Sequence, residues 1–221
     1  MLLPVVPVIL LVALVILMRS EVPSGRVAIE TASYLDAVES PGPTEATHKF
    51  RSVYPRKDER VIEVATLLQT VNPDLDESTR RSLGVLLVRL GEYYRYDPVL
   101  ILAVIMTESS FDPQSRSHMG ALGLMQIKPE TGESLAVETR RNWDGAHTLF
   151  DPYLNISLGV RYLAKLQKRF GTLEIALTAY NYGPTRVDEL LRHGEPLPVG
   201  YAQRVLDHYH RFRSLEASAS L

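Results

Sequence analysis

The sequence of 221 residues contains no cysteine. This absence excludes disulfide bonds, thiolate metal sites, a cysteine nucleophile and an acylated N-terminal cysteine. The six histidines do not show the HExxH-type spacing that a zinc site needs. We therefore expect neither a metal nor a cofactor.

The sequence also lacks a strong excess of charge of either sign. Its formal net charge is -2 at pH 7, so it has no basic field to hold a nucleic-acid backbone, and we expect no nucleic-acid partner. Hydrophobic residues make up 45% of the chain and charged residues 23%, which indicates a globular protein and not a disordered one. The length suits one domain with additional segments.

Charge is absent altogether from residues 2–18, "LLPVVPVILLVALVILM". This run is at the short end of the range for a membrane span and is long for a signal-peptide core. No basic residue precedes it, and no convincing cleavage site follows. The sequence therefore favours an uncleaved transmembrane anchor over residues 1–19, ahead of a cleaved signal segment and, third, a buried core helix.

The segment after this run is predicted to be a linker. Residues 20–57 are polar, contain Pro and Gly, and show no sustained periodicity. Arg19 and Arg26 follow the apolar run, which by the positive-inside tendency favours a cytoplasmic location for the rest of the chain. The orientation must therefore be decided from the function.

Alternating strand patterns of useful length are missing as well, and helical spacing continues from about residue 58. Asp97-Pro98 and Asp151-Pro152 are typical helix starts, because Asp caps the first turn and Pro fits its first position. The predicted helices cover residues 58–71, 76–96, 98–108, 151–171, 172–184 and 185–193, with a last helix near 201–213. We predict an all-α domain over residues 58–215, followed by a tail at 216–221.

One apolar stretch, "VLILAVIMTE" over residues 99–108, ends on a carboxylate, Glu108. A helix that is apolar on every side should be central and buried. Burial and the negative end of the helix dipole both disfavour the ionised carboxylate, which would keep Glu108 protonated near neutral pH, as a general acid requires. The alternative is that Glu108 only emerges into solvent where the helix ends, as most carboxylates do.

Three blocks of sequence resemble the soluble lytic transglycosylase family, in the right order over about residues 80–210. They are "ESSFDPQSRSHMGALGLMQIKPET", "FDPYLNISLGVRYLAKL" and "ALTAYNYGPTRV". The matching residues are Glu108, Ser109, Phe111, Pro113, Ser117, Gly120, Ala121, Gly123, Leu124, Met125, Gln126, Pro129 and Thr131 in the first block, Asp151, Pro152, Asn155, Gly159, Tyr162 and Leu163 in the second, and Ala179, Tyr180, Asn181, Gly183 and Pro184 in the third.

The resemblance implies the fold of goose-type lysozyme and a peptidoglycan lytic transglycosylase. Such an enzyme cleaves the β-1,4 bond between N-acetylmuramic acid (MurNAc) and N-acetylglucosamine (GlcNAc) without water, leaving 1,6-anhydroMurNAc ends. Glu108 is implied to be the single catalytic acid/base. The implied substrate-binding residues are Ser117, Met125, Gln126, Tyr180, Asn181 and Tyr201. Gly120 and Gly123 are expected to let the backbone approach the glycan.

The sequence departs from the family pattern near Tyr201. The family usually carries Glu-Thr shortly before this tyrosine, and the chain has Leu197 and Pro198 there. Tyr201 itself is kept, as is Val205. The departure therefore concerns the loop that positions the tyrosine.

Two other functions stay open at this stage. A goose-type lysozyme-like hydrolase would share the fold and the acid, and a non-catalytic glycan-binding protein of this fold would be expected to lose the glutamate. The resemblance implies peptidoglycan glycan strands as partner, with cell-wall or secretion-machinery proteins as further partners. It also implies a place in the cell envelope, with the catalytic domain in the periplasm, either anchored in the inner membrane through residues 2–18 or secreted.

Overall fold

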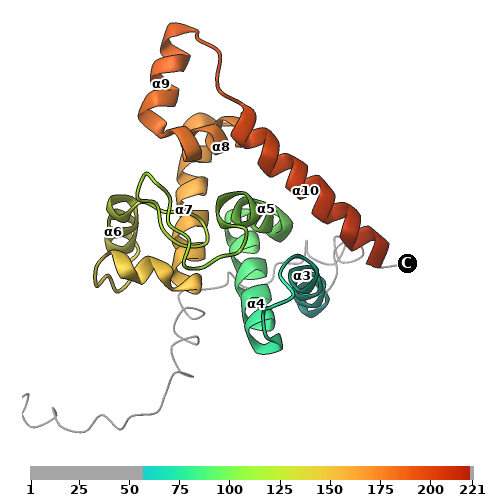
Figure 1. Cartoon of the computed structure of the whole chain (residues 1–221). Helices are drawn as coiled ribbons and strands as arrows, with labels where there is room; N and C mark the ends of the chain where they lie inside the picture. Colours follow the sequence, from blue (N-terminus) through green and yellow to red (C-terminus); the bar gives the residue numbers. More distant parts are fainter. Residues whose placement is uncertain (1–56, 220–221) are drawn as a thin grey trace, which may run out of the picture. The chain divides into compact units, whose positions relative to one another are not determined.

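A computed structural model describes residues 57–219 of the chain (Figure 1). Every regular element in this range is helical, which confirms the predicted all-α class. The elements are α3 (Lys57–Val71), α4 (Glu77–Tyr94), α5 (Pro98–Ser109), α6 (Pro129–Glu138), the 3₁₀ helix η3 (Ala146–Phe150), α7 (Pro152–Phe170), α8 (Leu173–Tyr182), α9 (Pro184–His193) and α10 (Gly200–Ala219). The predicted anchor and nearly all of the predicted linker lie outside the described residues.

Helix α5 is the buried centre of the domain, as its apolar sequence predicts. All residues from Pro98 to Ile105 are buried, because α5 packs extensively against α10 and also contacts α4. Asp97 caps its first turn, with the side chain accepting a hydrogen bond from the Val99 N–H. The most apolar segment of the domain therefore leads directly to Glu108.

Helix α7 forms the other half of the framework. It begins at Asp151, whose side chain accepts from the Leu154 N–H, and it ends at Gly171 with a φ of 85°. One face is buried against α8, α4, α6 and η3. This packing places α7 next to the long loop that connects α5 to α6.

Two elements were not predicted, α6 and η3. Helix α6 starts with Pro129 at its first position but has no side-chain cap, since Lys128 occupies the N-cap position. The sequence also placed the last helix near 201–213, whereas α10 continues to Ala219. Contacts between Glu216 and both Arg60 and Arg213 account for the extra turns.

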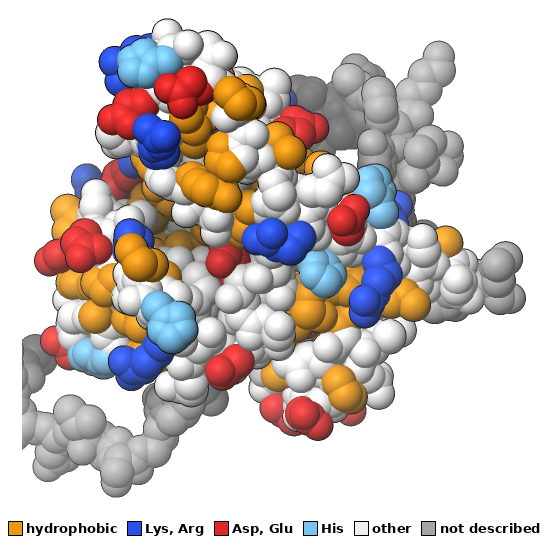
Figure 2. Space-filling view, turned by 45° about the horizontal axis from the view of Figure 1, so that its top comes forward, with side chains coloured by type: hydrophobic (Ala, Val, Ile, Leu, Met, Phe, Trp, Pro, Cys, Tyr) orange, Lys and Arg blue, Asp and Glu red, His pale blue; other side chains and the backbone are white. Residues whose placement is uncertain are grey.

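No helix between residues 57 and 219 is long and apolar enough to cross a membrane. The surface of this part carries acidic, basic and apolar side chains interspersed with one another, as Figure 2 shows for one face.

Candidate active site

The polypeptide turns sharply immediately after Glu108. Ser110 and Phe111 both have positive φ angles, of 51° and 66°. Two consecutive non-glycine residues in the left-handed region end the helix, and such costly conformations concentrate at functional sites. The Ser109 hydroxyl donates to the Leu124 carbonyl at 2.9 Å, which fastens the end of α5 to the following loop.

That loop, residues 110–128, is held against α7 by a buried asparagine. Asn155 is fully buried. Its Nδ2 donates to the Leu122 and Leu149 carbonyls at 2.9 and 2.8 Å, and its Oδ1 accepts from the Met125 N–H at 2.7 Å. Two of these hydrogen bonds fasten the loop to α7, and the third joins α7 to Leu149 of η3.

Gly123 has a different role from the one predicted. A Cβ on Gly123 would lie 2.2 Å from the Leu149 carbonyl oxygen and 2.4 Å from the Asn155 Nδ2. Only glycine fits, therefore, because the protein's own backbone and Asn155 approach it. Gly120 lies in open space with a φ of 79°, so its role is conformational.

Met125 lies beneath the pocket and not in it. Its side chain is fully buried, and a Cβ on Gly159 of α7 would lie 2.5 Å from its sulfur. Its N–H is bound by Asn155, and its carbonyl accepts a 2.8 Å hydrogen bond from the Tyr180 hydroxyl. The prediction that Met125 lines the sugar cleft is therefore wrong for its side chain: Met125 anchors the loop to α7 and α8.

Glu108 meets a tyrosine from the last helix. The Tyr201 hydroxyl donates to Oε1 of Glu108 at 2.6 Å, and Tyr201 itself is only 2% exposed. Burial raises the pKa of Glu108 to about 7, even though the Tyr201 hydrogen bond and the positive charge of Arg204 both act to lower it. The carboxyl is thus half protonated near neutral pH, as the sequence led us to expect.

Glu108 lines a pocket of about 350 Å³. Of the residues predicted to bind substrate or to act on it, five line this pocket: Glu108, Ser117, Gln126, Tyr180 and Asn181. They come from α5, the loop and α8, so the first and third sequence blocks meet here. A second, more open pocket of about 430 Å³ at Arg169, Asp188 and Leu191 contains none of the motif residues.

Ser117 and Gln126 are partly engaged by the loop itself. The Ser117 Oγ accepts from the Ala121 N–H at 2.9 Å, and within residues 57–219 the hydrogen bond to Glu108 comes from Tyr201 instead. The Gln126 Nε2 donates to the Gly123 and Ser115 carbonyls at 2.8 and 3.2 Å. Both N–H bonds of the Gln126 amide are thereby used, and its side-chain carbonyl is the group left to accept a hydrogen bond from a ligand.

The pocket is also lined by Thr131 and Tyr162, which match the family motifs but were not assigned to the site, and by three residues that the sequence reasoning missed, Met119, Lys128 and Tyr182. Met119 and Tyr182 are 77% and 48% exposed, so they present apolar surface to an incoming ligand. Tyr182 directly follows the predicted Asn181, and this adjacency was the available signal. No spacing rule points to Met119 or Lys128.

No group of three or more acidic, His or Cys side chains between residues 57 and 219 is arranged to hold a metal ion. The reactive group of the pocket is one half-protonated carboxyl, which lies near tyrosine and amide side chains. The chemistry that it can support is proton transfer to and from a bound neutral ligand.

The described domain is all-helical and has a half-buried acid near the end of its central helix, and it matches the lysozyme-like fold of a solved lytic transglycosylase. Residues 88–195 match the family model of the transglycosylase SLT domain. Together with the three motif blocks gathered around Glu108, this match and the relatives below support the similarity to the soluble lytic transglycosylase family.

Three relatives illustrate the similarity. The chain is 36% identical over 126 residues to membrane-bound lytic murein transglycosylase C of Sodalis glossinidius, covering 52% of this chain and 35% of the relative. It is 39% identical over 105 residues to membrane-bound lytic murein transglycosylase F of Desulfosudis oleivorans, covering 44% of this chain and 21% of the relative. The X-ray structure of an inactive mutant of lytic transglycosylase Slt from Pseudomonas aeruginosa aligns with a TM-score of 0.54 at 26% identity, covering 77% of this chain and 32% of that one. The chain thus spans about a third or less of the length of these relatives.

Proposed function

We propose that the chain is a peptidoglycan lytic transglycosylase that cleaves the MurNAc-β-1,4-GlcNAc bond and leaves 1,6-anhydroMurNAc ends. The observation that carries the proposal is the Glu108–Tyr201 pair beside the pocket, with the pKa of the acid raised by burial to about 7. The names of the relatives, lytic murein transglycosylases, point to the same reaction.

A single carboxyl suits this reaction. Within the described part of the chain, Glu108 is the only carboxylate that lines the pocket. A hydrolase of the common two-carboxylate kind needs a second acid to serve as nucleophile or to activate water. Asp112, the nearest acid along the sequence, is exposed, and its Oδ1 accepts from the Gln114 N–H at 2.9 Å in a local turn.

The proposed reaction uses the same carboxyl twice, first as a proton donor and then as a proton acceptor. Protonated Glu108 gives its proton to the oxygen that leaves C1 of MurNAc, and the C1–O bond breaks. The C6 hydroxyl of the same sugar then attacks C1 and gives its proton to the Glu108 carboxylate, which restores the acid. Because the nucleophile belongs to the substrate, no water has to be positioned or activated.

Tyr201 has a defined part in both steps. Burial raises the pKa of its hydroxyl well above the usual value, and so the hydroxyl stays a donor. Its hydrogen bond orients Oε1 and stabilises the ionised carboxylate between the two proton transfers. The Tyr180 hydroxyl is occupied by the Met125 carbonyl, so Tyr180 offers its ring to the pocket. We assign substrate binding to Ser117, Gln126, Tyr180 and Asn181.

Glu108→Gln tests the proposal on purified peptidoglycan, with products followed by mass spectrometry. The substitution keeps size and hydrogen bonding but removes the transferable proton, so turnover should fall by at least ~10²–10⁴-fold. The relative from Pseudomonas aeruginosa, an inactive mutant with a glutamate-to-glutamine replacement, supports this expectation. Asp112→Asn should keep activity, and Ser117→Ala should lie between.

The products decide between this function and its alternatives. Release of 1,6-anhydro ends supports the transglycosylase, whereas reducing ends would assign the chain to the lysozyme-like hydrolases. Binding without cleavage by the wild-type chain would indicate a glycan-binding protein.

We also propose that residues 58–215 act as the catalytic domain on the periplasmic side of the cell envelope. The apolar run at 2–18, outside the described residues, would anchor it in the inner membrane, and two relatives named as membrane-bound support this localisation. Alkaline phosphatase fused after Leu221 should then be active. Activity of only a cytoplasmic reporter at that position would refute the topology.

A further inference from the structure

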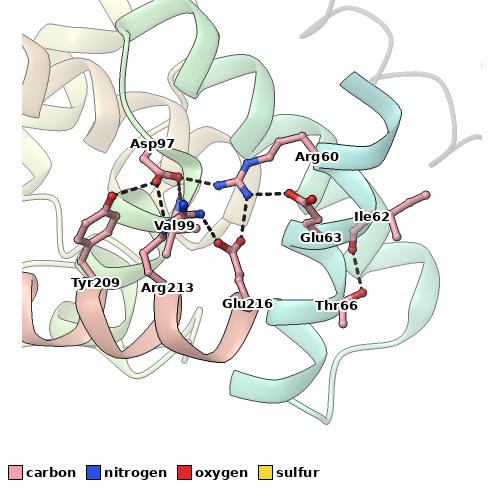
Figure 3. A network of polar contacts seen from close by, with 9 residues as sticks. All are labelled: Arg60, Ile62, Glu63, Thr66, Asp97, Val99, Tyr209, Arg213 and Glu216. Atoms are coloured by element: carbon pink, nitrogen blue, oxygen red, sulfur yellow. Dashed lines mark hydrogen bonds and ion pairs between the residues drawn. The ribbon is translucent and has the colours of Figure 1, made fainter. Parts of the chain in front are cut away.

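A polar cluster joins three helices at the end of α5 opposite to Glu108 (Figure 3). At its centre is Asp97. Its Oδ1 contacts Arg60 of α3 at 2.8 Å and its Oδ2 accepts from the Tyr209 hydroxyl of α10 at 3.0 Å. Arg213 of α10 lies 3.7 Å from the same Oδ2. Arg60 also contacts Glu216 of α10 at 3.1 Å, which closes the cluster.

This cluster and the candidate active site are the two ends of one helix pair. Glu108 follows Asp97 by 11 residues, about 16 Å along a helix. Tyr201 precedes Tyr209 by 8 residues and Arg213 by 12, about 12 and 18 Å. The two helices therefore run antiparallel, with Asp97 facing Tyr209 and Arg213 at one end and Glu108 facing Tyr201 at the other.

The loop that leads into α10 holds it through few hydrogen bonds, among them that from the Gln203 N–H to the Val199 carbonyl at 2.9 Å. Leu197 and Pro198 stand where Glu-Thr is expected, and residues 196–198, "PLP", make no hydrogen bond within the described chain. The two prolines have no N–H to donate. The polar contacts that set the position of α10 along α5 therefore include those of its body, from Tyr209 and Arg213 to Asp97, in addition to apolar packing.

We propose that Asp97 and Tyr209 are positioning residues for the Glu108–Tyr201 pair: they fix the register of α10 against α5 and so bring the Tyr201 hydroxyl to Oε1 of Glu108. The consequence for catalysis rests on the proposed function, but the consequence for the ionisation of Glu108 does not. Apolar packing alone tolerates small sliding of one helix along another, whereas a carboxylate bonded from both helices allows one register only.

Two substitutions remove the connection from opposite sides. Tyr209→Phe removes only the hydroxyl. Asp97→Asn keeps the cap of α5, since Asn caps helices as well as Asp, but it replaces the acceptor Oδ2 by an N–H₂ group. The matched control is Asp76→Asn, the same change at the cap of α4, where Asp76 accepts from the Thr79 N–H at 3.0 Å and does not contact α10.

The first readout is the pKa of Glu108 in the full-length chain, followed by NMR of ¹³C-labelled glutamate side chains. Since the Tyr201 hydrogen bond lowers this pKa, Tyr201→Phe should raise it. Tyr209→Phe and Asp97→Asn should raise it by a smaller amount, and Asp76→Asn should leave it unchanged. In the Tyr201→Phe background, Asp97→Asn should cause no further shift, because both changes act through one bond.

The second readout is turnover of peptidoglycan. Both positioning variants should lower kcat on the order of tenfold, less than the ~10²-fold that a 1 Å displacement can cost, with KM unchanged. An unaltered Glu108 pKa in Asp97→Asn would overturn the proposal, even if the melting temperature falls, because the cluster would then be purely structural. If Asp97→Asn shifts the Glu108 pKa but the wild-type chain cleaves no peptidoglycan, the proposed function is refuted and the positioning role stands.

Discussion

Replacing Glu108 by Gln should make the folded protein more stable at alkaline pH, although it abolishes the proposed activity. Burial raises the pKa of Glu108 from 4.5 to about 7. In the unfolded chain the carboxyl ionises near its ordinary value, so between these two values the folded state binds the proton that the unfolded state has released. Ionised Glu108 therefore costs stability as the pH rises through this window, and that cost is absent below it.

The size of the effect follows from the two pKa values. Compared with a carboxyl of ordinary pKa, Glu108 lowers the free energy of unfolding by about 1 kcal/mol at pH 5 and by about 3 kcal/mol at pH 8. The amide introduced by Glu108→Gln does not titrate, so the stability of this variant relative to wild type should rise by about 2.5 kcal/mol between these pH values. Any constant effect of the amide, including its bond with Tyr201, cancels in this difference.

Urea unfolding of the wild-type protein and of Glu108→Gln at pH 5 and pH 8 measures this difference in the free energy of unfolding. Glu138→Gln serves as the control, because hydrogen bonds from Lys165 and Arg161 lower the pKa of Glu138. Its contribution is lost only as the pH falls below about 4.5, so its difference from wild type should stay nearly constant between pH 5 and pH 8. A pH-independent difference for Glu108→Gln would refute the reasoning, since the carboxyl would then not be held protonated by burial.

Three further predictions concern activity and packing. The kcat/KM of the wild-type chain should fall above about pH 7 as Glu108 loses its proton, with no second ionisation from another carboxylate at lower pH. A pH profile of anhydromuropeptide release measures this dependence. Tyr201→Phe should move its midpoint to higher pH. Asn155→Ala should lower the free energy of unfolding by about 3–5 kcal/mol in urea, because it leaves buried backbone groups without partners. Tyr182→Ala should raise KM about fivefold with kcat unchanged, equivalent to about 1 kcal/mol of lost binding, and a loss in kcat instead would contradict a pure binding role.

The helices were predictable wherever the sequence contains its own start and stop signals. Asp97-Pro98 and Asp151-Pro152 begin α5 and α7 where expected, because capping and the fixed φ of proline act within one turn. Helix α6 was missed since Lys128 gives no capping signal. The sequence also predicted that α5 is buried and that its acid stays protonated, because a helix that is apolar on all sides cannot have an exposed face.

Long-range contacts were beyond these local rules. Nothing in the spacing of residues indicates that Tyr201 lies 2.6 Å from Glu108, or that Asn155 holds the Met125 N–H. The resemblance to the family identified Met125 and Gly123, but it could not separate residues that line the pocket from buried residues that support its lining.

The difference between local and long-range contacts matters for the acid in the pocket. A carboxyl that must first donate and then accept a proton needs a pKa near the working pH, and therefore two opposing influences in balance. Burial in α5 supplies one, and the Tyr201 hydroxyl with the Arg204 charge supplies the other. The first belongs to the helix that carries the acid, whereas the second arrives on α10, 93 residues away in sequence. The proton affinity of Glu108 is accordingly set by how accurately two helices are docked, which is why residues as distant as Asp97 can tune the chemistry without touching the substrate.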